Sequence, residues 1–378
     1  MFGGDFVPFF FSLFGRAAPI SVSIEPAHPV IEHRDGEQRL NFDFAVRNEG
    51  KESVRLIEVE VEILDATGRI AMKKTVNSDG LRPGIEVVAP SLLSPGTVTD
   101  LFNPFYSIPA DVSVGRLDYR FHFLAENTPE QAAANRHRLP MDFDVELRVS
   151  VTPSDFQTKT HLDLPLHGRV LVWEGHDFFA HHRRIPLNGE KASQLGLNGA
   201  NPNRYGSDLV IINEQGEMFH DDPYHKTNYY SYGQPIYAPA DGVIRASRND
   251  IPDNEFVGKH IRYPDLPSGA DEVLGNFVFI DHQDGEFSVL PHMRMGTVRV
   301  RPGDRVRQGD LLGEIGFSGD AIFPHVHFSL ILGPDIHNSE GIPAYFGHLT
   351  RLVGGKRIYA DHSSLDTGDI VEGTRGRK

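Results

Sequence analysis

The sequence predicts a mainly β protein, with an Ig-like β-sandwich in the N-terminal half and a second β-rich region after it. Three observations support this. The length of 378 residues is typical of two or three domains. The N-terminal half contains several segments in which apolar and polar residues alternate with a period of two. The second half is rich in glycine and proline, with short strand-like runs and almost no helical periodicity.

The N-terminal half, residues 20–155, is expected to form half-buried antiparallel strands bounded by turn sequences such as "NEGKES" and "DATGR". Only "NTPEQAAANRHR" interrupts them with a helix-like pattern, and no cluster of histidines and carboxylates is evident. Short strands at this spacing favour a sandwich with a structural or positioning role. The clearest strand patterns cover Leu40–Asn48, Ile57–Leu64, Leu117–Leu124 and Phe143–Val151.

The remaining segments are assigned by composition. Residues 1–19 carry an apolar run, which is too short to span a membrane. The residues before the run include Asp5 but no lysine or arginine, which is atypical of an export signal. Three interpretations therefore stay open: an export signal, a misplaced start of the sequence, or a packed N-terminal segment. Residues 156–168 lose the alternation and are predicted to be a linker. Residues 169–353 form the second domain, and residues 354–378 are expected to be a polar, loosely ordered tail.

Charge and cysteine content exclude several classes of partner and site. Lysine and arginine number 37 against 52 aspartates and glutamates, a net charge of -15. This balance argues against nucleic acid or an anionic membrane surface as the main partner. The absence of cysteine excludes disulfides and thiolate ligands, so any metal must be held by histidines and carboxylates. Composition does not predict the oligomeric state.

Candidate metal-site residues begin with the strand-like sequence "FPHVHFSL". His325 and His327 lie two places apart and therefore point to the same face of a strand. Three other stretches precede this one. "NRYGSDLVIIN" brings Asp208 into an apolar strand, "YGQPIYAPADGVI" reads as strand, turn and strand, and the stretch Glu286–Gly319 contains His292 and two Gly-Asp turns.

In this order and spacing, the four stretches resemble the lysostaphin/LytM-type zinc endopeptidases. The resemblance covers roughly residues 170–350, about half of the chain, and excludes the sandwich. It implies a mostly antiparallel β-sheet domain, a zinc cofactor, and hydrolysis of peptide bonds by a metal-activated water. The family's substrates imply bacterial cell-wall peptidoglycan cross-links as the partner and an exported, periplasmic or envelope location.

The resemblance also assigns roles to individual residues. In the family, the second histidine of the His-x-His motif and an upstream aspartate bind zinc. These two positions correspond to His327 and Asp208 in this chain. The first histidine of the motif, His325, and the histidine of an earlier strand, His292, lie beside the metal water. There they act as catalytic bases or orienting groups.

One position departs from the family pattern. The family supplies its first ligand four residues before the aspartate, where this chain has Arg204, which cannot bind zinc. The sequence "AHHRR" followed by "NRYGSD" resembles a variant in which an upstream histidine is the ligand. That histidine would be His182, with His181 and His176 as the alternatives.

Two other interpretations remain open. Arg204 is compatible with a degenerate, non-catalytic relative that binds the cell wall or regulates other proteins. The hairpin sequence after Ala240 is also similar to biotinyl and lipoyl carrier domains, but the lysine that those domains display on their turn has no counterpart here. Three further histidines, His220, His225 and His282, are expected to be loop residues.

Overall fold

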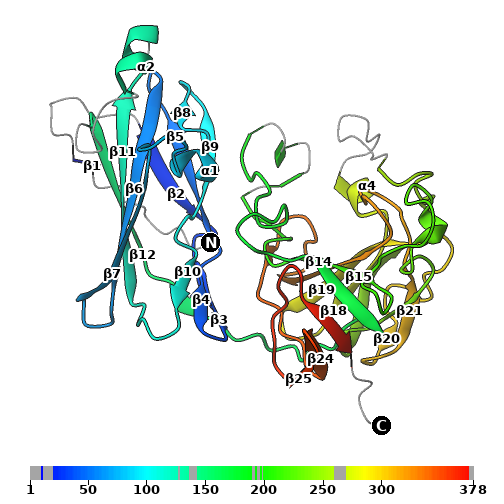
Figure 1. The fold of residues 1–378 in the computed structure, drawn as a ribbon. Coiled ribbons are helices and arrows are strands. Elements are labelled where there is room, and N and C mark those ends of the chain that lie inside the picture. The colour runs from blue at the N-terminus through cyan, green and yellow to red at the C-terminus, as the bar shows by residue number, and fades with distance from the viewer. Residues whose placement is uncertain are drawn as a thin grey trace. The chain divides into compact units, whose positions relative to one another are not determined.

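In a computed structural model the protein is mainly β, as predicted. The chain forms two compact units, Met1–Phe156 and Gln157–Lys378 (Figure 1). The structure describes residues 10–11, 20–126, 128–135, 143–189, 192–193, 196–197, 199–258 and 270–373. The N-terminal segment discussed as an export signal therefore lies, apart from Phe10 and Phe11, outside the described residues.

The described part of the first unit contains three sheets, with strands ordered β1-β12-β11-β6-β7 (β8 pairs with β6), β10-β4-β3-β13 and β2-β5-β9. Two short helices are described, α1 (Ile85–Val88) and α2 (Pro129–Asn135). The strands are β1 (Phe10–Phe11), β2 (Ile20–Glu25), β3 (Val30–Arg34), β4 (Glu37–Arg39), β5 (Asp43–Asn48), β6 (Val54–Leu64), β7 (Ile70–Asn77), β8 (Leu92–Leu93), β9 (Val98–Phe102), β10 (Ser107–Pro109), β11 (Arg116–Ala125), β12 (Val145–Val151) and β13 (Ser154–Asp155).

The four segments with period-two alternation all form strands, namely β5, β6, β11 and β12. Their apolar side chains share one buried cluster, in which Phe44 contacts the rings of Tyr119 and Phe121 edge-on. Alternation produces this core because successive side chains of a strand point to opposite faces. The described strands of this unit therefore share a hydrophobic core, while its Ig-like topology remains a prediction.

Two expectations for this half were wrong. The predicted helix is not the only one among the described residues of this unit, because Ile85–Val88 forms the short helix α1. Its single turn has two buried apolar residues, which are too few to show a helical period in the sequence. A histidine–carboxylate cluster also exists: His122 lies between Glu58, 3.0 Å from its Nδ1, and Glu146, 3.2 Å from its Nε2. The three residues are register partners on neighbouring strands, so their proximity depends on strand pairing that a sequence does not display.

The first unit should fold without the second. Expressed as residues 20–155, it is expected to unfold cooperatively, because its strands bury their own apolar face. A chelator should leave the transition unchanged, which thermal circular dichroism with and without EDTA would measure. A fragment without a cooperative transition would mean that the two units depend on each other for folding.

The second unit is built on one long antiparallel sheet with the order β20-β17-β18-β19-β22-β15-β14-β26-β24-β25, in which β23 also pairs with β22. A separate antiparallel pair joins β16 to β21, and α4 (Ala270–Leu274) and a 3₁₀ turn (Lys226–Asn228) are the helical segments described. The strands are β14 (Arg169–Glu174), β15 (Ser207–Ile211), β16 (Pro235–Tyr237), β17 (Gly242–Arg248), β18 (Asn276–Asp281), β19 (Glu286–Met293), β20 (Arg305–Val306), β21 (Leu311–Glu314), β22 (Val326–Leu332), β23 (Glu340–Gly341), β24 (Leu349–Val353), β25 (Lys356–Ala360) and β26 (Ile370–Gly373).

Sheet order brings the chemically interesting strands together. β19, β22, β15 and β14 are consecutive neighbours in the middle of the sheet. Asp208 on β15 is the register partner of His327 on β22 on one side and of Glu174 on β14 on the other. Cross-strand partners project to the same face of a sheet. The three side chains therefore form a row across three strands.

The C-terminal segment is not the loosely ordered tail that its polarity predicts. Residues 356–360 form β25, and residues 370–373 form β26, which pairs with both β14 and β24. Val371 and Leu365 are buried and anchor the segment. The sequence did not predict these strands, because two isolated apolar residues form no periodic pattern within a polar segment. In the structure, both side chains are nevertheless part of the core.

Removal of this segment should destabilise the second unit. Truncation after Val353 is expected to lower its thermal midpoint by several degrees or to abolish cooperative unfolding, because β14 loses its hydrogen-bonded neighbour β26. Differential scanning calorimetry would measure this, with a truncation after Gly373 as the control. An unchanged midpoint would contradict a structural role for β26.

The segment predicted to be a linker contributes to the second unit from Gln157 onward. The backbone N–H of Thr160 donates to the buried carboxylate of Glu286 at 2.8 Å, and Lys159 N–H donates to the same group at 2.9 Å. Leu162 and Leu166 are buried. The segment is therefore packed rather than free. Among the described residues, no helix has the length and apolarity needed to cross a bilayer.

Candidate metal centre

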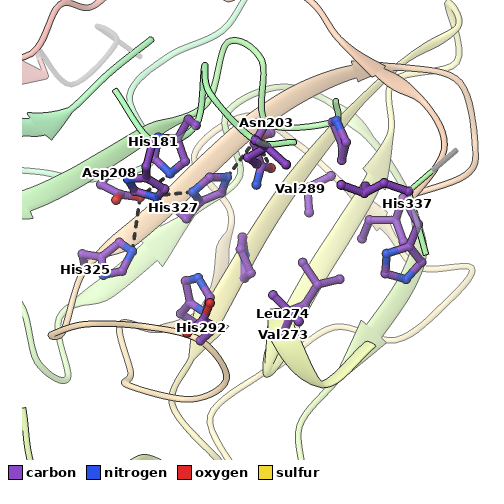
Figure 2. A pocket seen from close by; sticks show the side chains of 18 of the residues that line it. His181, Asn203, Asp208, Val273, Leu274, Val289, His292, His325, His327 and His337 are labelled. Carbon is purple, nitrogen blue, oxygen red and sulfur yellow. Dashed lines mark hydrogen bonds and ion pairs between the residues drawn. The ribbon is translucent and has the colours of Figure 1, made fainter. Parts of the chain in front are cut away.

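A cavity of about 460 Å³ in the second unit is lined by all five residues that the sequence resemblance selected (Figure 2). They are His182, Asp208, His292, His325 and His327. Apolar side chains, among them Val273, Leu274 and Val289, line another part of the wall, as Figure 2 shows. The cavity thus joins a cluster of imidazoles to an apolar surface.

Three imidazoles converge on one oxygen atom of Asp208. Its Oδ1 lies 3.1 Å from His327 Nδ1, 3.2 Å from His325 Nε2 and 3.4 Å from His182 Nε2. The rings of His182 and His327 are 4.6 Å apart. His292 lies next to this group, with its ring centre 5.2 Å from that of His325. All five side chains are buried.

Hydrogen bonds on the outer side of each ring fix its orientation. The Nδ1 atoms of His292, His325 and His182 face the backbone carbonyls of Ser318, Phe323 and Gly175 at 2.9, 2.7 and 3.4 Å. His327 has the opposite arrangement, with Nε2 2.9 Å from Ser329 Oγ. The tautomer that donates to each acceptor leaves a lone pair on the inner nitrogen, which is the state that a metal ligand or a general base requires.

Local backbone irregularity aims His292 into the cavity. The pairing of β18 with β19 shifts register between Asn276 and Val278, opposite the Pro291–His292 step. His292 itself has a φ of 63°, in the left-handed region that non-glycine residues seldom occupy. Irregularities of this kind re-aim side chains and concentrate at functional sites. The strand pattern in the sequence contains no sign of this shift.

Burial and charge set the protonation states of the site. Burial drives the pKa of His182 and of His292 well below the usual value, so both rings are neutral. Burial alone would raise the pKa of Asp208, but the neighbouring imidazoles, His325 first, hold that pKa well below its usual range. Burial opposes a charge on His325 as well, yet Asp208 outweighs it and the pKa of His325 is raised.

Arg204, at the position where the family carries a ligand, is directed elsewhere. Its side chain is buried, and its Nε forms an ion pair with Glu340 on β23. Glu340 also accepts the backbone N–H of Asn201 at 3.0 Å. Arg204 therefore ties the chain before β15 to β23, which pairs with β22. His182, from the loop after β14, approaches Asp208 instead.

Glu174 and His181 lie next to His182 and Asp208, and only His181 was considered from the sequence. Glu174 accepts the backbone N–H of His181 at 2.6 Å and pairs with its Nδ1. Among the described residues, Glu174, His181, His182 and Asp208 form the group whose ligand atoms all lie within 4.8 Å of one another. His181 was an alternative ligand, whereas Glu174 was missed because a bulge between Val172 and Glu174 sets its register.

The other candidate histidines lie elsewhere. His176 is buried, with its ring 5.2 Å from that of Tyr205, and does not line the cavity. His282 bonds the Asp241 carbonyl and Ser288 Oγ at a turn. His220 and His225 are exposed and lie beside the aspartates Asp221 and Asp222 in their own loop.

The donor set fits a zinc ion. Catalytic zinc takes three protein ligands from nitrogen, sulfur and oxygen and keeps one position open. His182 Nε2, Asp208 Oδ1 and His327 Nδ1 supply two nitrogens and one oxygen from side chains held by further hydrogen bonds. The neutral state of His182 also suits ligation, since a protonated imidazole cannot bind a metal.

Comparison with known proteins finds a family match within this unit. Residues 228–339 match the model of peptidase family M23. The matched residues lie within the second unit. The predicted relationship to LytM-type endopeptidases is thus confirmed over these residues. The M23 match includes His292, His325 and His327 but begins after Asp208, so the upstream half of the candidate centre lies outside it.

Curated relatives are similar to this chain over segments of 100 and 151 residues. The cell division protein DipM of Caulobacter vibrioides is 27% identical over 151 residues, 40% of this chain and 18% of that protein. The peptidoglycan DD-endopeptidase ShyC of Vibrio cholerae is 28% identical over 100 residues, 26% of this chain and 18% of that protein. The chain thus spans less than a fifth of the length of these relatives.

Two solved structures of M23 proteins also match parts of the chain at low identity. The M23 metalloprotease pseudoalterin is 15% identical, with 58% of this chain and 98% of that chain covered and a TM-score of 0.29. A catalytic domain of the M23 protein EnpA from Enterococcus faecalis is 19% identical, covering 35% of this chain and 92% of that chain, with a TM-score of 0.22.

Proposed function

We propose that the second unit is a zinc-dependent endopeptidase that hydrolyses peptide cross-links of bacterial peptidoglycan. The observation that carries this proposal is the convergence of His182, His325 and His327 on Asp208 Oδ1. The M23 match and the DD-endopeptidase relatives support the reaction class and the substrate. The same relationship favours an exported or envelope location.

His182, Asp208 and His327 would hold the metal. A bound zinc ion supplies Lewis acidity, which polarises a carbonyl oxygen and makes water acidic enough to attack at neutral pH. Ser329 Oγ and the Gly175 carbonyl fix the two ligand rings from outside. His181 and His176, the earlier alternatives to His182, are not part of this set of three.

His325 and His292 would manage the protons of the reaction. Each ring is held at Nδ1 by a backbone carbonyl, so Nε2 is the atom that exchanges a proton in the cavity. His325 Nε2 next to Asp208 can take a proton from the attacking water, because the carboxylate stabilises the imidazolium that results. His325 would then pass this proton to the leaving amine. His292, which burial keeps neutral, would accept a hydrogen bond at Nε2 from the attacking water or from the leaving amine.

A direct test combines metal analysis with digestion of purified peptidoglycan. The expected result is one zinc per chain and release of uncross-linked muropeptides, both lost on dialysis against a chelator and regained with zinc. Protein that holds no zinc at micromolar zinc concentrations would overturn the proposal.

The second candidate function is a non-catalytic cell-wall binding or regulatory role. Arg204 favours it, because a ligand position has been converted into an ion pair with Glu340. In that case the protein would bind peptidoglycan in a pull-down without releasing fragments, and Ala substitution at His325 would leave its behaviour unchanged.

Ser329 gives a graded prediction. Ser329→Ala removes the acceptor at His327 Nε2 and should weaken zinc binding about 10- to 100-fold, the usual cost of losing an outer partner of a metal ligand. Competition with a fluorescent chelator would measure the affinity. Ser288→Ala, which changes a serine that pairs with His282 rather than with a site residue, is the matched control.

A further inference from the structure

Glu174 and His181 have no role in the proposed reaction, yet they adjoin the proposed zinc ligands. Glu174 is a register partner of Asp208, so two carboxylates stand side by side on one face of the sheet. Imidazoles already face both carboxylates, His181 at Glu174 and His182 at Asp208, so oxygen and nitrogen donors gather at one place. The imidazoles of His181 and His182, whose ring centres are 4.0 Å apart, complete the group.

The bulge at Glu174 gives this arrangement its geometry. The pairing of β14 with β15 shifts register between Val172 and Glu174, which places Glu174 opposite Asp208. Glu174 then receives the backbone N–H of His181, which fixes the His181–His182 step above both carboxylates. As a result, the four ligand atoms lie within 4.8 Å of one another.

We propose that Glu174 and His181 form a second, weaker divalent-cation site, which Zn²⁺ occupies together with Asp208 as a bridging carboxylate. The proposal rests on the zinc site formed by His182, Asp208 and His327, which it extends. One carboxylate can serve two cations because it has two oxygens, and proteins with paired metals place them about 3.5–4 Å apart. Mixed nitrogen and carboxylate donors suit zinc.

Exposure explains why this site should be the weaker one. The His181 side chain is 60% exposed and Glu174 is 16% exposed, whereas His182 and Asp208 are almost fully buried. A cation held by Glu174 and His181 would therefore keep several waters and exchange readily with solvent. The buried site should fill first, and the exposed one only when zinc is in excess.

The test is equilibrium dialysis of the full chain against increasing Zn²⁺, with bound metal measured by elemental analysis. Wild-type protein is expected to bind one equivalent tightly and a second at least about 10-fold more weakly, by the loss of affinity that poorer ligation brings. His181→Ala and Glu174→Gln should each lose only the weak equivalent. His225→Ala, an exposed histidine in another loop, should keep both.

Each other outcome has a definite meaning. A single equivalent in wild type, unchanged in Glu174→Gln, would overturn the second site and leave the proposed function intact. Weaker tight binding in Glu174→Gln would show that Glu174 positions the His182 loop, which also overturns it. Protein with no tight equivalent would instead contradict the proposed zinc enzyme itself.

Discussion

Replacing His182 with alanine is expected to strip the protein of its tightly bound zinc and of all hydrolytic activity. In the proposed site His182 Nε2 would supply one of three protein donors, and catalytic zinc is seldom stable on two. Its removal should therefore cost more than the roughly 100-fold that loss of an outer partner costs. His327→Ala and Asp208→Ala should have the same effect. Elemental analysis after dialysis, paired with muropeptide release, measures both consequences.

The neighbouring histidine provides the control. His181 adjoins His182 in sequence, but its side chain is 60% exposed and pairs with Glu174. His181→Ala should therefore retain the tight zinc and fold as wild type. Full zinc content in His182→Ala would mean that another residue completes the ligand set, and the assignment of His182 would have to be withdrawn.

Alanine at His325 or His292 is expected to separate metal binding from turnover. Both variants should keep one tight zinc, because neither ring belongs to the proposed ligand set. Both should lose about 10²- to 10⁴-fold in hydrolysis rate, the usual contribution of a positioned acid or base. Rates on a soluble cross-linked muropeptide, with zinc content measured on the same samples, would establish this.

Both rings are buried, so their removal leaves a cavity that could unfold the protein. Circular dichroism would show whether each variant is still folded. His325→Gln and His292→Gln fill more of that space while lacking a titrating ring. A variant at either position that loses zinc along with activity would place that histidine among the ligands instead.

Sequence patterns predicted the strands and the residues of the cavity for different reasons. Period-two alternation identified β5, β6, β11 and β12, because burial on one face leaves a mark on every second residue. The motif order singled out five of the residues that line the cavity. Their roles as ligands or bases remain predictions.

Features that depend on register escaped the sequence. The Glu174 bulge, the histidine–carboxylate cluster at His122 and the left-handed backbone of His292 all depend on how strands pair, which the local sequence pattern did not predict. The C-terminal strands were missed for a different reason. β26 is short and polar in its flanks, and it is stable because β14 and β24 hold it on both sides.

The pairing of β26 with β14 has a consequence for the order in which the protein acquires its structure. β14 opens the second unit and β26 closes it, so nearly the whole unit separates two adjacent strands. Contacts between residues so distant in the chain carry a large loop-closure entropy and slow the search for the native state. Glu174 and the His182 loop follow directly from β14. The cavity should therefore be among the last parts to consolidate, which would keep a nascent chain inactive until its synthesis has passed residue 373.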